Sequence, residues 1–182
     1  MIRIRLPRIQ RGMSMIEVLM AVLIFTVGLV GLGALMVTAS KANQMAYVRT
    51  QVTFLANGMA DRMRANPWGL WNGSYDDDNY PVTGTPGACN AATGCKPSEI
   101  ADRDKKLWSQ QLRDSLPAVG KSSIKCTKAK GFDPSDVYQM RPPYSGSCVM
   151  TITWAERGFA TGGGDDKVAA DSLQSFTWKF EP

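Results

Sequence analysis

The sequence predicts an α+β protein in which one long amino-terminal helix packs on a small antiparallel sheet. Three observations support this. Residues 18–37 are uncharged and mostly apolar, the helical pattern continues without a breaker to residue 66, and short β-rich runs follow Pro117. A chain of 182 residues has room for one membrane segment and one modest domain.

The apolar run is long enough to cross a membrane. Twenty helical residues rise about 30 Å, which matches the hydrocarbon core of a bilayer. The first twelve residues contain four arginines and no acid, so the positive-inside rule predicts a cytoplasmic amino terminus and an exported carboxyl-terminal part. A secretory signal would carry its cleavage site after the apolar run, whereas here the small-residue junction Gly12-Met13 precedes it.

Gly12, Met13 and Glu17, followed by this apolar run, resemble the amino-terminal motif of type IV pilins and pseudopilins. The resemblance implies a type IV pilin-like fold. It also implies that a prepilin peptidase cuts after Gly12 and methylates the new amine of Met13, and that Glu17 is the carboxylate used in assembly. The expected parts are a basic prepilin leader (1–12), a membrane and assembly helix (13–37), an amphipathic helix (38–66) and a periplasmic head (67–182).

Glu17 has two interpretations. Ser14 and Glu17 match a capping box, in which the glutamate bonds to the first amide of its own helix. Alternatively, if helices pack side by side in a filament, the carboxylate leaves water and needs a cation such as the Met13 amine of a neighbouring subunit. We favour the second interpretation.

The second half of the helix is one-sided. Its apolar residues follow three- and four-residue steps, which predicts an amphipathic helix whose stripe supports a globular head. The stripe consists of Met45, Val48, Val52, Leu55, Met59 and Met63.

Residues 67–97 are rich in Gly, Pro, Asn and Asp, which predicts a long loop with little regular structure. Residues 76–79 read Asp-Asp-Asp-Asn, and calcium is one interpretation because it prefers several oxygen ligands. The spacing is not that of an EF-hand, so we favour solvated turn residues and expect no metal site.

Four cysteines in an exported domain predict two disulfides, for which three connectivities exist. Cys89–Cys95 with Cys126–Cys148 is the economical choice, because the loops that it closes are short or moderate. A zinc site is the rival interpretation, but the sequence lacks two C-x-x-C pairs.

A second helix is expected at residues 98–116, with Ser98 as its cap and Pro117 after its end. Strands are expected at 122–127, 137–141, 148–155 and 173–180, where β-branched and aromatic residues gather. An antiparallel sheet of three or four strands would then cover the stripe of the long helix.

The composition argues against catalysis. The chain has no histidine, and no Ser-His, Cys-His or phosphate-loop pattern is present, so we expect no enzyme, catalytic residue or cofactor. Of the 21 basic residues four lie in the leader, which leaves 17 against 16 acids and makes nucleic acid an unlikely partner. A cluster of lysines keeps a DNA-binding or adhesive pilin open as an alternative: Lys121, Lys125, Lys128 and Lys130.

Two further segments, residues 55–67 and the Thr-Ile-Thr-Trp-Ala-Glu strand at 151–156, resemble minor pilins of the PilV type, the type IV pilus modification proteins. That resemblance implies a low-abundance subunit that primes or modifies pilus assembly. Its partners would be membrane lipid before assembly, the prepilin peptidase, the inner-membrane assembly machinery, other minor pilins and the major pilin. It would move from the bacterial inner membrane to the pilus at the cell surface. A type II secretion pseudopilin is the main alternative, and a single-span periplasmic enzyme is the weakest.

Overall fold

The structure is a computed structural model, and it describes residues 12–89, 94–131, 143–155 and 173–182. The chain divides into two units, Met1–Gln44 and Met45–Pro182. The helix α1 (Met15–Ala65) contributes residues to both units. Most of the basic leader and the expected strand at 137–141 lie outside the described residues.

The first unit consists of the amino-terminal part of α1. Every described side chain from residue 12 to residue 40 is exposed, including all of the apolar ones. The most apolar 18-residue window of α1 has a mean hydropathy of 2.6, and none of it is buried. This part of α1 is therefore long and apolar enough to span a membrane.

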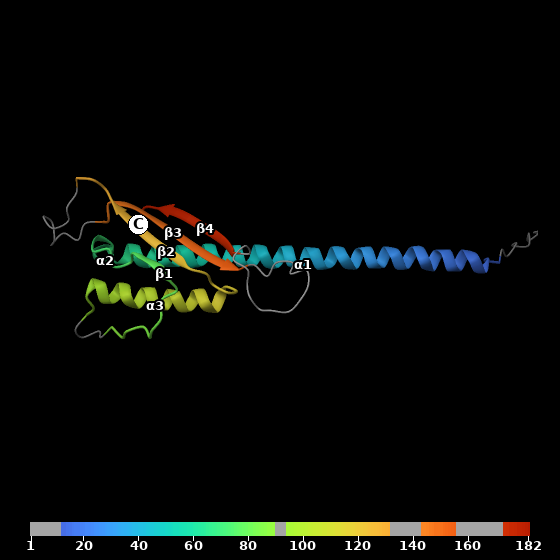
Figure 1. Cartoon of the computed structure of the whole chain (residues 1–182), viewed down its shortest axis with the longest axis horizontal. Coiled ribbons are helices and arrows are strands. Elements are labelled where there is room, and N and C mark those ends of the chain that lie inside the picture. The colour runs from blue at the N-terminus through green and yellow to red at the C-terminus, as the bar shows by residue number, and fades with distance from the viewer. Residues whose placement is uncertain (1–11, 90–93, 132–142, 156–172) are drawn as a thin grey trace, which may run out of the picture. The chain divides into compact units, whose positions relative to one another are not determined.

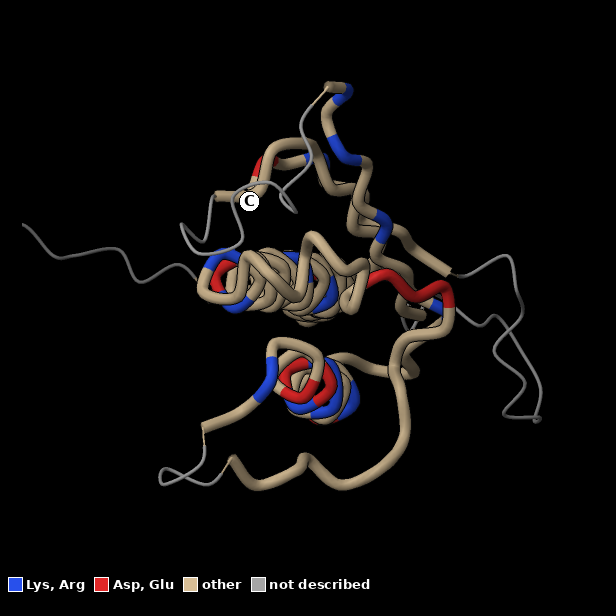
Figure 2. The backbone as a smooth tube through the Cα atoms, turned by 90° about the vertical axis from the view of Figure 1, so that its left-hand side faces the viewer, with Lys and Arg blue, Asp and Glu red and all other residues tan. Residues whose placement is uncertain are grey.

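The second unit is an α+β head (Figure 1). After α1 it contains α2 (Pro67–Trp71), β1 (Asp77–Tyr80), α3 (Pro97–Ser115), β2 (Ser122–Lys128), β3 (Gly146–Ala155) and β4 (Leu173–Phe180). The four strands form one antiparallel sheet in the order β1-β2-β3-β4. Figures 1 and 2 place residues 45–65 of α1 between this sheet and α3. The predicted fold class is confirmed.

The stripe of α1 is buried, but its composition differs from the prediction. Four of the six expected residues are in the core, whereas Met45 is 38% exposed and Leu55 is only partly buried. Ala56 and Ala60 are fully buried in their stead. Because α1 has the sheet on one side and α3 on the other, small side chains are needed where the elements approach closely.

The helix α3 begins one residue earlier than expected, and the prediction that Ser98 caps it is wrong. Lys96 is the cap residue, and its backbone N–H donates to Glu99 Oε2 at 2.9 Å. Pro97 fills the first helical position, where a missing N–H costs nothing. Trp108 and Leu112 are buried in the core, and Trp108 Nε1 donates to the Leu55 carbonyl oxygen of α1 at 2.9 Å.

The prediction of a loop with little regular structure at 67–97 is wrong for residues 67–80, because α2 and β1 lie there, whereas the described residues 81–89 and 94–96 form no helix or strand. The Asn66 side chain caps α2 by accepting a hydrogen bond from the Gly69 N–H at 3.2 Å. Strand β1 is rich in acids, which strands usually lack, so local preference did not reveal it. It is held by pairing with β2 and by the burial of Tyr80, which is 1% exposed.

Candidate functional site

The processing segment predicted from the sequence precedes the helix. Gly12, Met13 and Ser14 are not helical, and all three are exposed. The first turn of α1 is closed by backbone bonds, in which Glu17 and Val18 donate their N–H groups to the Ser14 carbonyl oxygen at 3.1 and 3.3 Å. The Gly12-Met13 peptide bond is therefore outside the helix, and both of its residues are exposed.

Glu17 lies in the first turn of α1 with its side chain exposed. An acid at this place also suits the positive end of the helix dipole. The apolar side chains that follow are largely exposed, and their contact with water is unfavourable. Leu23, Phe25 and Leu32, for example, are 57%, 64% and 65% exposed. An apolar surface of this size needs lipid or neighbouring helices to cover it.

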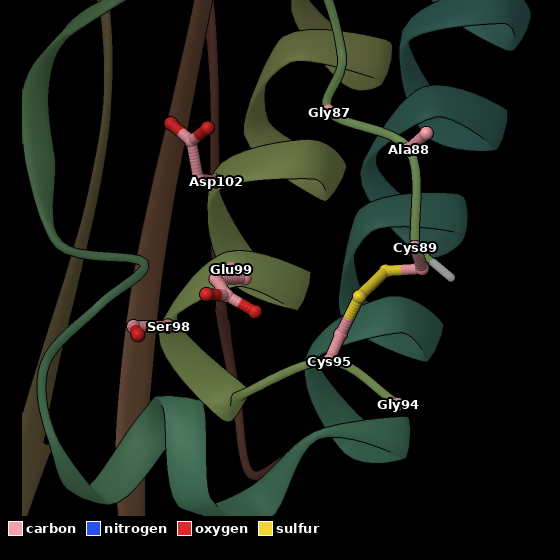
Figure 3. Close-up of a pocket in the computed structure, with 8 residues that line it drawn as sticks. All are labelled: Gly87, Ala88, Cys89, Gly94, Cys95, Ser98, Glu99 and Asp102. Carbon is pink, nitrogen blue, oxygen red and sulfur yellow. A yellow bond between two sulfur atoms is a disulfide. The ribbon is translucent and has the colours of Figure 1, made fainter. Parts of the chain in front are cut away.

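The structure joins Cys89 to Cys95 and Cys126 to Cys148, the pairing that the sequence favours. Cys126 and Cys148 are directly opposite in the β2–β3 register, so this disulfide crosses the middle of the sheet. The other disulfide borders an open depression of about 500 Å³ beside the first turns of α3 (Figure 3). The two acids that line this depression already have partners. Glu99 accepts a hydrogen bond from the Lys96 N–H, and Asp102 forms an ion pair with Lys106 Nζ at 2.7 Å.

The acid run at 76–78 has structural partners. Asp76 Oδ1 accepts a hydrogen bond from the Cys126 N–H at 3.1 Å, and Asp78 pairs with Lys125 at 3.0 Å. Asp77 lies 4.0 Å from Lys105 Nζ. Burial raises the pKa of Asp76 above its ordinary value, against the lowering effect of the Cys126 amide and nearby lysines. Within the described ranges, no cluster of three or more His, Cys, Asp or Glu residues could hold a metal ion.

The four lysines of the candidate DNA-binding cluster lie in different surroundings. Lys125 points to the side of β2 opposite the buried Ile124 and pairs with Asp78, whereas Lys128 lies 6.0 Å from the centre of the Trp71 ring. Lys121 and Lys130 are exposed at the two ends of the strand. The backbone view of Figure 2 shows basic residues spaced along this strand, with acidic residues close by.

A buried polar network, which the sequence does not reveal, joins the end of α1 to α3. Asn66 is 5% exposed, and its Nδ2 donates to Tyr75 Oη at 3.1 Å and to the Pro97 carbonyl oxygen at 2.7 Å. Tyr75 Oη in turn donates to Asp104 Oδ2 at 2.9 Å. The only local signal is the Asn-Pro pair, which predicts a helix end and says nothing about partners 31 residues away.

A comparison with known families gives one match. The family model for the prokaryotic N-terminal methylation motif matches residues 7–33, which include Gly12, Met13 and Glu17. No curated protein and no solved structure matches the chain. The motif and the apolar helix together indicate a membrane-anchored type IV pilin or pseudopilin that prepilin peptidase processes.

Proposed function

We propose that this chain is a minor type IV pilin that helps to prime or modify pilus assembly and has no enzymatic activity. One observation carries the proposal. The methylation motif at residues 7–33 overlaps the beginning of the 51-residue helix α1, and the carboxyl-terminal part of α1 contributes buried residues to the core of an α+β head. The head therefore stays attached to the apolar half of the helix, both in the membrane and after assembly into a pilus.

In this proposal, prepilin peptidase cuts between Gly12 and Met13 on the cytoplasmic face and methylates the Met13 amine. The exposure of both residues and their place before the first helical turn support this step. Cleavage there removes the basic leader and leaves the apolar helix attached to the head. The product keeps its head in the periplasm and its helix in the inner membrane until assembly.

Glu17 is proposed to act during assembly. Its side chain is exposed while the subunit is alone, so it needs no partner there. When apolar helices pack side by side, a carboxylate in the first turn loses water, and this is costly unless a cation pairs with it. The methylated amine of Met13 in a neighbouring subunit would supply that cation and fix the register of the two helices.

The minor-pilin assignment is supported by the segment at 55–67, which resembles pilins of the PilV type. In the head this segment supplies the Leu55 carbonyl that accepts the Trp108 bond and the Asn66 side chain that caps α2. It therefore sets how α1, α2 and α3 meet. A subunit with this head would join other minor pilins and the major pilin through the assembly machinery of the inner membrane.

The proposal is tested by deleting the gene and counting surface pili with retraction intact and with retraction blocked. We expect few pili in the deletion strain and recovery when retraction is blocked, because a priming subunit lowers the barrier to starting a fibre. Normal piliation in both backgrounds would contradict the proposal.

A type II secretion pseudopilin is the second candidate, because pseudopilins carry the same methylation motif. The same deletion strain separates the two functions. Loss of secreted enzymes with normal piliation would support the pseudopilin, whereas loss of pili with normal secretion supports the minor pilin.

A further inference from the structure

The two edges of the sheet in the head differ in how they are protected. The β1 edge is four residues long, carries acids at Asp77 and Asp78, has an irregular register with β2 and is followed by Pro81. Short length, charge, irregularity and proline are the devices that keep a sheet edge from pairing with another chain. The β1 edge is therefore closed to strand addition.

The β4 edge has none of these devices among its described residues. Strand β4 pairs with β3 through eight consecutive residues without a register shift, and it contains no proline. Its single charge is Lys179, which lies on the exposed face of the sheet. A regular edge of this length offers a row of backbone donors and acceptors.

The hydrogen bonds of β3 show which backbone groups of β4 are not used in pairing with β3. Thr153 directs its N–H to Ser122 Oγ and its carbonyl to the Gly120 N–H, both on the side of β2. Because the direction alternates along a strand, the even-numbered residues of β3 bond to the even-numbered residues of β4 that face them. Ser175, Thr177 and Lys179 therefore direct their N–H and C=O groups away from β3.

The side chains along this edge define the kind of strand that would fit. Phe176 and Trp178 lie on the inner face and are only partly buried against the core. The exposed face carries Ser175, Thr177 and Lys179. A partner strand with apolar residues on the inner side would cover the two rings, and an acid opposite Lys179 would complement its charge.

We propose that the outer edge of β4, which pairs with no other described strand, accepts an extended segment of another polypeptide as a fifth, antiparallel strand. That segment alternates apolar and polar residues and places an acid opposite Lys179. This strand addition is separate from the proposed role in priming and rests only on the membrane anchoring of the chain. Anchoring in one membrane excludes a second copy of this chain as the antiparallel partner. Antiparallel β4–β4 pairing would reverse residues 45–65 of α1 in the second copy, so the two chains would enter their heads from opposite directions (Figure 1).

Parallel pairing with a second copy also fits poorly. A two-fold axis along the strands would turn the second sheet over and bring its polar face, with Ser175, Thr177 and Lys179, next to Phe176 and Trp178. The aromatic rings would then gain no apolar cover. A different polypeptide of alternating pattern satisfies both the backbone groups and the rings.

The test uses the full chain in detergent and a fluorescent synthetic peptide of alternating valine and threonine with one central glutamate. Thr177→Pro removes an outward N–H and leaves the β3 ladder intact, whereas the matched control Thr177→Val keeps the N–H. We expect Thr177→Pro to weaken peptide binding about tenfold and Thr177→Val to change it less than about twofold. On binding, the amides of Ser175, Thr177 and Lys179 should exchange more slowly with deuterium.

A charge-reversal arm adds an independent readout. Lys179→Glu should weaken binding of the glutamate peptide and strengthen binding of the same peptide with lysine in place of glutamate. If Thr177→Pro melts at a lower temperature than Thr177→Val, Ser175→Pro serves as the edge variant. Failure of the wild-type chain to bind, equal binding by the proline variant, or a dimer that the proline variant abolishes would each overturn the proposal. None of these outcomes changes the pilus counts of the deletion strain. The strand addition at β4 and the proposed minor-pilin function can therefore be contradicted independently of each other.

Discussion

Asn66 donates a hydrogen bond of 2.7 Å from Nδ2 to the carbonyl oxygen of Pro97, which ties the end of α1 to the start of α3. The same side chain caps α2 through the Gly69 N–H and bonds to Tyr75. One buried amide thus connects all three helices of the head.

Asn66→Ala should lower the unfolding free energy of the head by about 2–3 kcal/mol, because it leaves buried donors and acceptors without partners. Denaturant unfolding of the full chain in detergent, followed by tryptophan fluorescence, measures the change. Asn57→Ala is the matched control, since the Asn57 amide makes one exposed bond to the Thr53 carbonyl. Equal losses in both variants would contradict the assigned role.

Two glycine substitutions should act in opposite directions. A Cβ at Gly69 would collide with the Asn66 side chain, so Gly69→Ala should destabilise the head. Gly58 lies within α1 with no heavy atom near its added Cβ, and Gly58→Ala should stabilise the helix by about 0.5–1 kcal/mol. Thermal unfolding of the two variants side by side distinguishes them by the sign of the shift.

The two disulfides should contribute unequally to stability. Their cysteines are 22 residues apart in Cys126–Cys148 and 6 apart in Cys89–Cys95. In the chain-entropy treatment, double alanine variants should cost about 3 kcal/mol and about 2 kcal/mol respectively. The difference should grow further because Cys148 is fully buried. A larger loss from the Cys89–Cys95 variant in denaturant unfolding would be inconsistent with this ranking.

The head should lose stability as the pH rises above the ordinary tyrosine pKa of about 10. Burial raises the pKa of both Tyr75 and Tyr80, so the folded state keeps protons that the unfolded state releases. Unfolding then becomes easier with each step in pH. In an absorbance titration near 295 nm these two tyrosines should ionise only as the protein unfolds. Tyr80→Phe should remove one tyrosine from that late step, and an unchanged late step would refute the assignment.

Glu17→Ala should leave membrane insertion intact and abolish incorporation into pili. Insertion depends on the apolar residues after Glu17, whereas the proposed function requires the carboxylate to pair with a cation when it leaves water during incorporation. Membrane fractionation measures the first property, and immunogold labelling or recovery from sheared pili measures the second. Ser14→Ala is the control for a capping role. If Ser14→Ala blocks incorporation as strongly as Glu17→Ala, capping is the better explanation.

The sequence by itself predicted the features that depend on local spacing. The processing motif, the apolar run, the end of α1 at Asn66-Pro67 and strand β4 at 173–180 are each defined by residues close together in the chain. Fold class followed from these, because one long helix and several β-rich runs leave few arrangements. The preferred disulfide pairing is also local, since each bridge joins cysteines at most 22 residues apart.

Only the tertiary structure shows that residues 45–65 of α1 are covered by the sheet on one side and by α3 on the other (Figures 1 and 2). This arrangement explains why Ala56 and Ala60 are buried while Met45 is not. The tertiary structure also decided that Asp77 and Asp78 begin β1 and that Asp76 precedes it. The strand forms because Tyr80 is buried and because Lys125 and the Cys126 amide lie across from the acids. The position of β4 at the edge of the described sheet is likewise a property of the assembled sheet. These features depend on partners distant in sequence, and no local pattern specifies which distant groups will meet.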